Sequence, residues 1–350
     1  MANSKAFVAD LASSVSHVPA KYIRPTSDRP NLSEFWSTLD DSSIPVIDLQ
    51  DLRGPSRPIV IKEIGQACKD YGFFQVKNHG VSSTVIDAMF RVSREFFQLP
   101  ESERLKIHSN DPMKEVRLAS SFNVNTEHVS NWRDYLRLFC HPLEDYIHQW
   151  PSNPPSFREA AAEYCRNARE LALTLLDAIS ESLGLERDYI NTVLGKHGQH
   201  MAVNYYPPCP QPELTYGLTG HTDPNAITLL LQDDVPGLQV LNNDKWLPVK
   251  PIPYAFFVNI GDQIQVISND RYKSVRHRAL VNSEKERISI PTFYCPSADA
   301  VIGPAPPLTD DDIDNHHPAF YRRFAYSEFY RKFWSRGLAE ENCLDMFKIK

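Results

Sequence analysis

The sequence Met-Ala-Val-Asn-Tyr at residues 201–205 begins a succession of short β-type runs that continues to residue 293. Pro, Gly, Asn or Asp punctuate these runs, and no helical pattern separates them. Short strands at such regular spacing predict an antiparallel sandwich or barrel. The runs are MAVNY at 201–205, AITLLL at 226–231, LQVL at 238–241, FFVNI at 256–260, IQVI at 264–267 and ISIPTF at 288–293.

The chain on either side of this region has mostly helical patterns, with a strand or two in the first half. We therefore expect a mainly β fold with packed helices, in one catalytic domain over residues 1–350. Its parts are a mainly helical N-terminal part at 1–198, the β core at 199–300 and a C-terminal helical segment at 301–350. Helices are expected at 59–71, from Ser83 to about Phe97, from the N-cap Ser156 to Gly184, and from about Pro318 to Trp334, and a strand at 73–76.

Composition excludes several classes of protein. The formal net charge of −7 over 350 residues gives no basic surface for nucleic acid. The first ten residues lack the apolar core of a secretory signal, and no apolar run approaches the ~20 residues of a membrane helix. We expect a cytoplasmic protein that binds no membrane. Its six cysteines form no CxxC pair, which argues against a disulfide framework or a structural zinc site.

A histidine and an aspartate two residues apart, His221 and Asp223, lie in the β region. Residues i and i+2 of a strand point to the same side, so both side chains can reach one point. His277 follows in another expected strand. Two histidines and one carboxylate on one face form the triad that binds Fe(II) and leaves coordination positions open. We predict that these three residues bind the metal and that the open positions admit O2 and a co-substrate.

Arg287 and Ser289 repeat the same i, i+2 pattern ten residues after the second histidine. A guanidinium binds a carboxylate through two hydrogen bonds, and a nearby hydroxyl adds another. Either motif alone is common in exposed turns, but their combination in strand context indicates a site. We predict that Arg287 and Ser289 bind the distal carboxylate of a 2-oxo diacid beside the metal.

With these motifs, the chain resembles the plant soluble 2-oxoglutarate/Fe(II)-dependent dioxygenases, whose core is a double-stranded β-helix, or jelly roll. The resemblance runs over nearly the whole chain. It implies that Tyr206 hydrogen-bonds 2-oxoglutarate and that Asn204 lies near the iron. The matching motifs are IPVIDL at 44–49, GFFQV at 72–76, NHG at 78–80, NYYPPCP at 204–210, HTD at 221–223, His277 and RIS at 287–289.

Three further motifs, SFNV at 121–124, NWRDYL at 131–136 and FWSR at 333–336, are similar to one branch of that family. This branch contains the salicylate hydroxylases and flavone synthases, the oxygenases linked to downy-mildew susceptibility. The resemblance implies a monomer that hydroxylates a small aromatic or phenolic substrate, salicylate first, with succinate and CO2 as co-products. It also implies Fe(II), 2-oxoglutarate, O2 and, as reductant, ascorbate.

Two alternatives stay open. A flavone synthase would instead desaturate a flavanone with the same cofactors, and sequence does not separate the two reactions. A non-catalytic jelly-roll binding protein is the alternative from another class, although such a protein has no reason to keep the metal triad and Arg287 together.

The substrate pocket is predicted to be flat and aromatic, with stacking and hydrophobic burial of the ligand. The aromatic residues Phe329, Phe333 and Trp334 are candidates for a C-terminal lid, and Arg117 is expected in an exposed loop rather than on a substrate carboxylate. The predicted substrate-binding residues are Phe122 and Val124 on a covering segment, Phe293 and Cys295 on the strand face of Ser289, and Tyr135 and Leu138.

Overall fold

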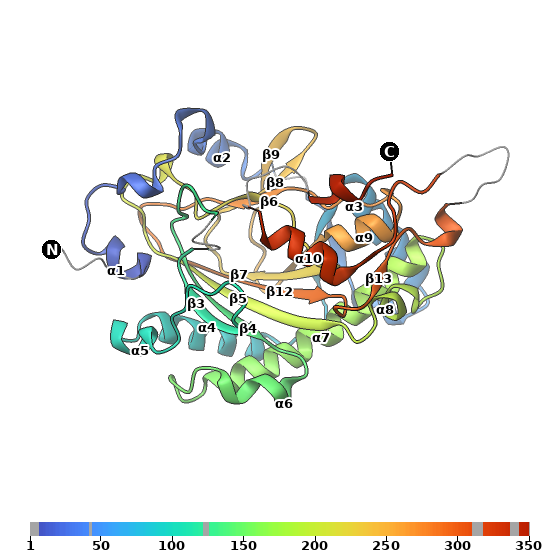
Figure 1. Cartoon of the computed structure of the whole chain (residues 1–350), viewed down its shortest axis with the longest axis horizontal. Helices are drawn as coiled ribbons and strands as arrows, with labels where there is room; N and C mark the ends of the chain where they lie inside the picture. Colours follow the sequence, from blue (N-terminus) through green and yellow to red (C-terminus); the bar gives the residue numbers. More distant parts are fainter. Residues whose placement is uncertain (1–6, 42–43, 122–125, 310–317, 337–342, 350) are drawn as a thin grey trace.

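The computed structural model describes residues 7–41, 44–121, 126–309, 318–336 and 343–349. An eight-stranded sheet in the order β1-β2-β10-β7-β12-β5-β4-β3 faces a four-stranded sheet in the order β6-β11-β8-β9 (Figure 1). Residues of both sheets line one cavity between them. This arrangement confirms the expected mainly β fold with a jelly-roll core and packed helices.

The large sheet is antiparallel except for the pair β1 and β2. Its strands are β1 (Val46–Asp48), β2 (Phe73–Lys77), β3 (Val116–Ala119), β4 (Asp134–Phe139), β5 (Gly198–Tyr206), β7 (Ile227–Gln232), β10 (Phe256–Ile260) and β12 (Arg287–Cys295). The other strands are β6 (Leu218–His221), β8 (Leu238–Asn242), β9 (Lys245–Pro248), β11 (His277–Ala279), β13 (Val301–Ile302) and β14 (Phe324–Ala325).

Ten α-helices occur in the described part of the chain. They are α1 (Val8–Ala12), α2 (Leu32–Thr38), α3 (Arg57–Asp70), α4 (Ser83–Phe97), α5 (Glu101–Leu105), α6 (Leu143–Tyr146), α7 (Phe157–Ser182), α8 (Tyr189–Leu194), α9 (Asp262–Ile267) and α10 (Tyr326–Trp334). No helix of the described residues is long and apolar enough to cross a bilayer.

Local sequence explains the two longest helices of the first half, and both agree with prediction. At the start of α4, Ser82 accepts a hydrogen bond from the backbone N–H of Val85, and Pro100 follows the helix soon after its end. The helix α7 has Ser156 at its N-cap. It ends before Gly184, whose φ of +74° is the left-handed conformation that favours glycine.

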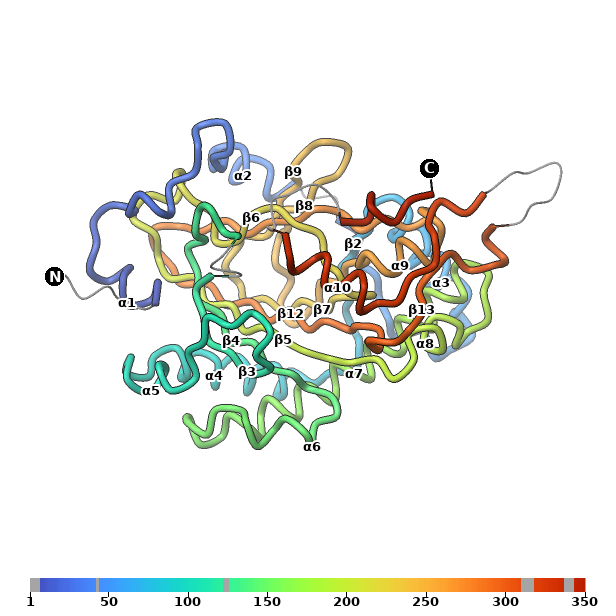
Figure 2. Tube along the Cα trace, viewed as in Figure 1, coloured from blue at the N-terminus to red at the C-terminus, as the bar shows by residue number. Residues whose placement is uncertain are grey.

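The helices α3, α4 and α7 pack on the outer face of the large sheet, as the trace in Figure 2 also shows. The main hydrophobic core lies in this layer, with buried side chains such as Ile64 of α3, Met89 of α4 and Leu175 of α7. Because the core fills the outer face, the inner face is left to line the cavity.

Three expectations about elements are wrong. The run at 264–267 is not a strand but most of α9, in which Ile264, Val266 and Ile267 are fully buried. A short, wholly buried apolar run has no periodicity that separates strand from helix. The first half also contributes four strands to the large sheet rather than one or two, and the C-terminal helix is limited to α10.

Candidate metal and co-substrate site

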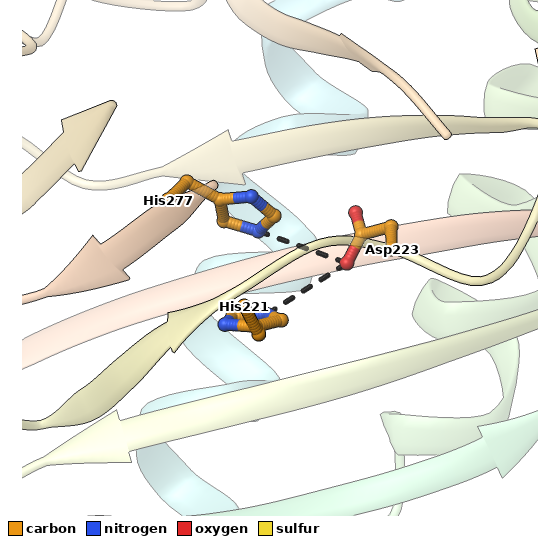
Figure 3. A group of neighbouring side chains, drawn as sticks. All are labelled: His221, Asp223 and His277. Atoms are coloured by element: carbon orange, nitrogen blue, oxygen red, sulfur yellow. Dashed lines mark ion pairs between the residues drawn. The ribbon is translucent and has the colours of Figure 1, made fainter. Parts of the chain in front are cut away.

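The two histidines and the aspartate of the predicted triad converge at one edge of the small sheet (Figure 3). His221 ends β6, His277 begins β11, and the two residues lie opposite each other in an antiparallel pair. The Nε2 atom of each imidazole is 3.7 Å from the Oδ1 atom of Asp223. One potential ligand atom from each residue lies within 4.8 Å of the others, so the three side chains could hold one metal ion.

Neighbouring groups orient the side chains of Asp223 and His221. The Oδ2 atom of Asp223 accepts hydrogen bonds from the Thr228 hydroxyl and the Asn259 amide, each at 2.6 Å, which leaves Oδ1 for a metal. The Nδ1 atom of His221 lies 2.9 Å from the carbonyl oxygen of Thr219. An N–H···O bond there fixes the proton on Nδ1 and leaves Nε2 as the free donor atom.

The electrostatics of the triad also suit a cation. Burial lowers the pKa of His221 to about 3, and the neighbouring His277 adds to this effect, so its imidazole is neutral at physiological pH. Burial alone would raise the pKa of Asp223, but the two imidazoles and its hydrogen bonds hold it below its usual value. The neutral imidazole of His221 and the ionised carboxylate of Asp223, with the His277 ring beside them, form a donor set for a divalent ion.

The guanidinium of Arg287 lies in the same cavity at the start of β12 and is 2% exposed. Its Nε donates to the carbonyl oxygen of Val235 at 3.1 Å, and Nη2 donates to the side chain of Gln232 at 2.9 Å. The remaining nitrogen, Nη1, is buried and has no hydrogen-bond partner among the described residues. A buried donor without a partner costs free energy, and the carboxylate of a bound diacid would satisfy it.

The residues expected around the co-substrate adjoin this guanidinium. The ring of Tyr206 lies opposite Arg287 in the β5–β12 pair, with its centroid 5.2 Å from the guanidinium carbon. Two positions along the same strand pair, the amide of Asn204 donates to the hydroxyl of Ser289 at 3.3 Å. All four side chains line the cavity, and together they fit the carboxylate end of 2-oxoglutarate.

The substrate residues have mixed outcomes. Tyr135 and Phe293 line the cavity, while Phe122 and Val124 lie outside the described residues. The prediction for Leu138 is wrong because it is three residues from Tyr135, so strand alternation turns it into the main core on the opposite face. Cys295 does not line the cavity either. It lies at the end of β12, with its sulfur 3.7 Å from Nδ1 of His200.

The C-terminal helix α10 closes one side of the cavity. Phe333 and Trp334 line it as expected of a lid, together with Tyr330, whereas Phe329 is fully buried in the main core. The expectation for Arg117 is wrong, because this residue belongs to β3 and has no exposed surface.

Sequence reasoning missed two cavity-lining arginines, Arg133 and Arg137. The sequence does contain a pattern that predicts the position of both arginines. Both residues differ from Tyr135 by two positions, so the alternation that places Tyr135 in the cavity places them there as well.

A jelly-roll core whose cavity joins this triad to a buried, partly unpaired arginine defines a mononuclear metal oxygenase that takes a diacid co-substrate. Comparison with known proteins agrees. Residues 197–296 match the model of the 2OG-Fe(II) oxygenase superfamily. Residues 44–153 match the model of the N-terminal region of non-haem dioxygenases in morphine synthesis.

Individual relatives cover almost the whole chain. Protein DMR6-LIKE OXYGENASE 1 of Arabidopsis thaliana is 61% identical over 99% of this chain and 97% of its own. Flavanone 3-dioxygenase 2 of Oryza sativa subsp. japonica is 54% identical over 95% of this chain and 94% of its own. The crystal structure of JOX2 in complex with 2OG, Fe and JA superposes with a TM-score of 0.88, at 37% identity and 98% coverage of both chains.

The chain therefore belongs to the 2OG-Fe(II) oxygenase superfamily. It is an enzyme, a plant-type 2-oxoglutarate-dependent dioxygenase, and its cofactors are Fe(II) and 2-oxoglutarate. A purely binding role for the jelly roll is thereby set aside.

Proposed function

We propose that His221, Asp223 and His277 bind Fe(II), and that Arg287 binds the far carboxylate of 2-oxoglutarate with Ser289 and Tyr206. Asn204 then lies near the iron. The observation that carries the proposal is the convergence of the three ligand side chains in the cavity that holds the unpaired Nη1 of Arg287.

Iron and 2-oxoglutarate, when bound, supply the activation of O2 and the electrons released as 2-oxoglutarate becomes succinate and CO2. The protein positions the co-substrate and excludes water from the cavity. Because Val235 and Gln232 fix the Arg287 guanidinium, its Nη1 would meet the co-substrate carboxylate at one defined position. The aromatic side chains of α10 limit the access of water to the cavity.

For the organic substrate, we propose a small phenolic, with salicylate first and hydroxylation as the reaction. The support is the cavity wall, in which Tyr135, Phe293, Phe333 and Trp334 offer rings to a flat ligand. The resemblance to the salicylate-hydroxylating branch points the same way. Oxidation of a flavanone, including desaturation to a flavone, is the second candidate, and the 54% identity to flavanone 3-dioxygenase 2 favours it.

The test is succinate release under air with Fe(II), ascorbate and 2-oxoglutarate, across salicylate, naringenin and related phenolics. Succinate that rises with one compound, together with a product heavier by one oxygen, supports hydroxylation of that compound. A product lighter by two hydrogens identifies a desaturase. If no phenolic increased succinate release, the substrate proposal would be refuted. If the purified protein did not bind Fe(II), the proposed metal site would be refuted.

A further inference from the structure

Two arginines in the cavity have no role in the site as proposed. Arg133 directly precedes β4, Arg137 lies within it, and both line the cavity while only 5% exposed. The Nε atom of each is buried and finds no hydrogen-bond partner in the part of the chain that the structure describes. Arg133 donates to the Asn204 side chain, and Arg137 donates to backbone carbonyls including that of Pro112 at 2.8 Å. Among the described residues, neither has a carboxylate as hydrogen-bond or ion-pair partner.

The strand register separates Arg137 from the co-substrate anchor. Arg287 lies opposite Tyr206, whereas Arg137 lies opposite Ala202, four residues earlier on β5. Four residues of extended strand correspond to about 13 Å. The distal carboxylate of one 2-oxoglutarate molecule cannot contact the guanidiniums of both Arg287 and Arg137. Arg137 is therefore available to a second anion. Arg133, in contrast, lies close to the co-substrate anchor. The next residue, Asp134, is opposite Tyr205, which adjoins the Tyr206 that faces Arg287.

The surroundings of Arg137 suit an aromatic acid. Its neighbour across the strands, Ala202, has a one-carbon side chain and leaves space on the cavity floor. The ring of Trp334 lies 5.7 Å from the guanidinium carbon. Two residues from Ala202 on β5, His200 stacks on Phe293, with ring centroids 4.8 Å apart and planes 22° apart. A flat ring can therefore occupy this part of the cavity with its charged group on Arg137.

Charge balance gives an independent reason for an anion. In the loaded site, the charges of Fe(II) and Arg287 are balanced by Asp223 and the two carboxylates of 2-oxoglutarate. The guanidiniums of Arg133 and Arg137 then have no countercharge among the described residues, in a cavity largely shielded from water. Arg133 is held by the side chain of Asn204, near the co-substrate anchor, so Arg137 is the one available to a second anion. His200 does not change this balance, because burial and then the positive charge of Arg137 lower its pKa to about 3 and keep it neutral.

We infer that Arg137 binds the carboxylate of the organic substrate, so that the enzyme selects an aromatic acid over a neutral flavanone. The inference rests on the oxygenase function proposed above and decides between its two substrate classes. Arg137 is thus a specificity-determining residue, and Phe293 and Trp334 contact the ring of the bound acid.

The test compares salicylate with salicylamide, which keeps the ring and phenol but replaces the carboxylate by a neutral amide. Both are titrated calorimetrically, without oxygen, into the Fe(II)- and 2-oxoglutarate-loaded enzyme. Removal of one partner of a buried charge pair predicts that wild type binds salicylate at least about 30-fold more tightly than salicylamide. Arg137→Gln should bind the two compounds within about threefold of each other. Arg91→Gln, which removes a half-exposed arginine of α4, should keep the wild-type preference.

A second pair of variants keeps the arginine and its contacts with the loop at Pro112, in case Arg137→Gln fails to fold. Ala202→Glu places a carboxylate beside Arg137, and Ala202→Gln adds a neutral side chain of the same size. We expect Ala202→Glu to bind salicylate at least about tenfold more weakly than Ala202→Gln, with equal effects on salicylamide. Equal salicylate affinities in these two variants would overturn the inference.

The outcomes also separate this inference from the proposed function. A wild type that binds salicylate and salicylamide alike, or that prefers naringenin, overturns the role of Arg137. The oxygenase proposal still holds in that case, provided that naringenin drives succinate release. An enzyme that binds salicylate with the predicted preference but releases no succinate supports the role of Arg137 and refutes salicylate as the substrate.

Discussion

Replacement of Arg287 by glutamine should weaken 2-oxoglutarate binding far more than it weakens the fold. The guanidinium is 2% exposed, and its hydrogen bonds to Val235 and Gln232 fix it in place before the co-substrate arrives. Loss of one partner of a buried charge pair costs about 2–5 kcal/mol. Each 1.4 kcal/mol is a factor of ten, so the dissociation constant of 2-oxoglutarate should rise about 30-fold at least.

Arg94 provides a matched control. It lies 3.9 Å from Asp233, the same carboxylate that the charge of Arg287 influences, but its side chain is 41% exposed. An exposed ion pair contributes about 1 kcal/mol at most. Arg94→Gln should therefore change 2-oxoglutarate binding by no more than about fivefold.

The assay is calorimetric titration of 2-oxoglutarate into the Fe(II)-loaded variants without oxygen, with iron content measured on the same samples. Full iron content with weak 2-oxoglutarate binding in Arg287→Gln is the expected result. If Arg287→Gln and Arg94→Gln lost affinity equally, the reasoning from burial would be refuted. If Arg287→Gln lost its iron, Arg287 would serve the metal site rather than the co-substrate.

Four further predictions concern the metal, the pocket and the fold. His277→Ala should purify with less than a tenth of the wild-type iron, and metal analysis that finds normal iron would remove it from the ligand set. Thr228→Val should weaken Fe(II) about 10–100-fold in a competition titration, because it removes one hydrogen bond that orients Asp223; unchanged affinity would contradict this. Phe293→Ala should raise KM for the phenolic substrate about tenfold while iron content stays normal, and an unchanged KM would exclude ring contact. Burial lowers the pKa of His197 from 6.5 to about 4, so its neutral form stabilises the fold above pH 6.5 and this contribution is lost as pH falls toward 4. The melting temperature should therefore fall less between pH 6.5 and 4 in His197→Gln than in wild type, and equal falls would refute this.

The site was predictable where a strand's alternation decides which side chains share a face. His221 with Asp223, and Arg287 with Ser289, are each two residues apart, and the structure directs each pair into the cavity. The same rule explains the error at Leu138, an odd number of positions from Tyr135.

Other features depend on contacts between distant segments, which no local pattern contains. The burial of Arg117 results from the pairing of β3 with β4 at the edge of the large sheet. The fully buried run at 264–267 forms the helix α9 because tertiary packing, rather than periodicity, determines its conformation. The strands β1 and β2 likewise join this sheet through β10, which lies more than a hundred residues later in the chain.

The architecture divides the work of the site between the two sheets. The small sheet provides both histidines, through β6 and β11, while the large sheet provides Arg287, Ser289 and the proposed substrate contact Arg137. Asp223 connects the two halves, because its Oδ1 faces the imidazoles and its Oδ2 is held by Thr228 on β7 of the large sheet. A shift of one sheet against the other would therefore change the metal geometry first at this carboxylate. It follows that substitutions behind Asp223 should affect both iron and 2-oxoglutarate binding, whereas substitutions behind Arg287 should affect 2-oxoglutarate alone.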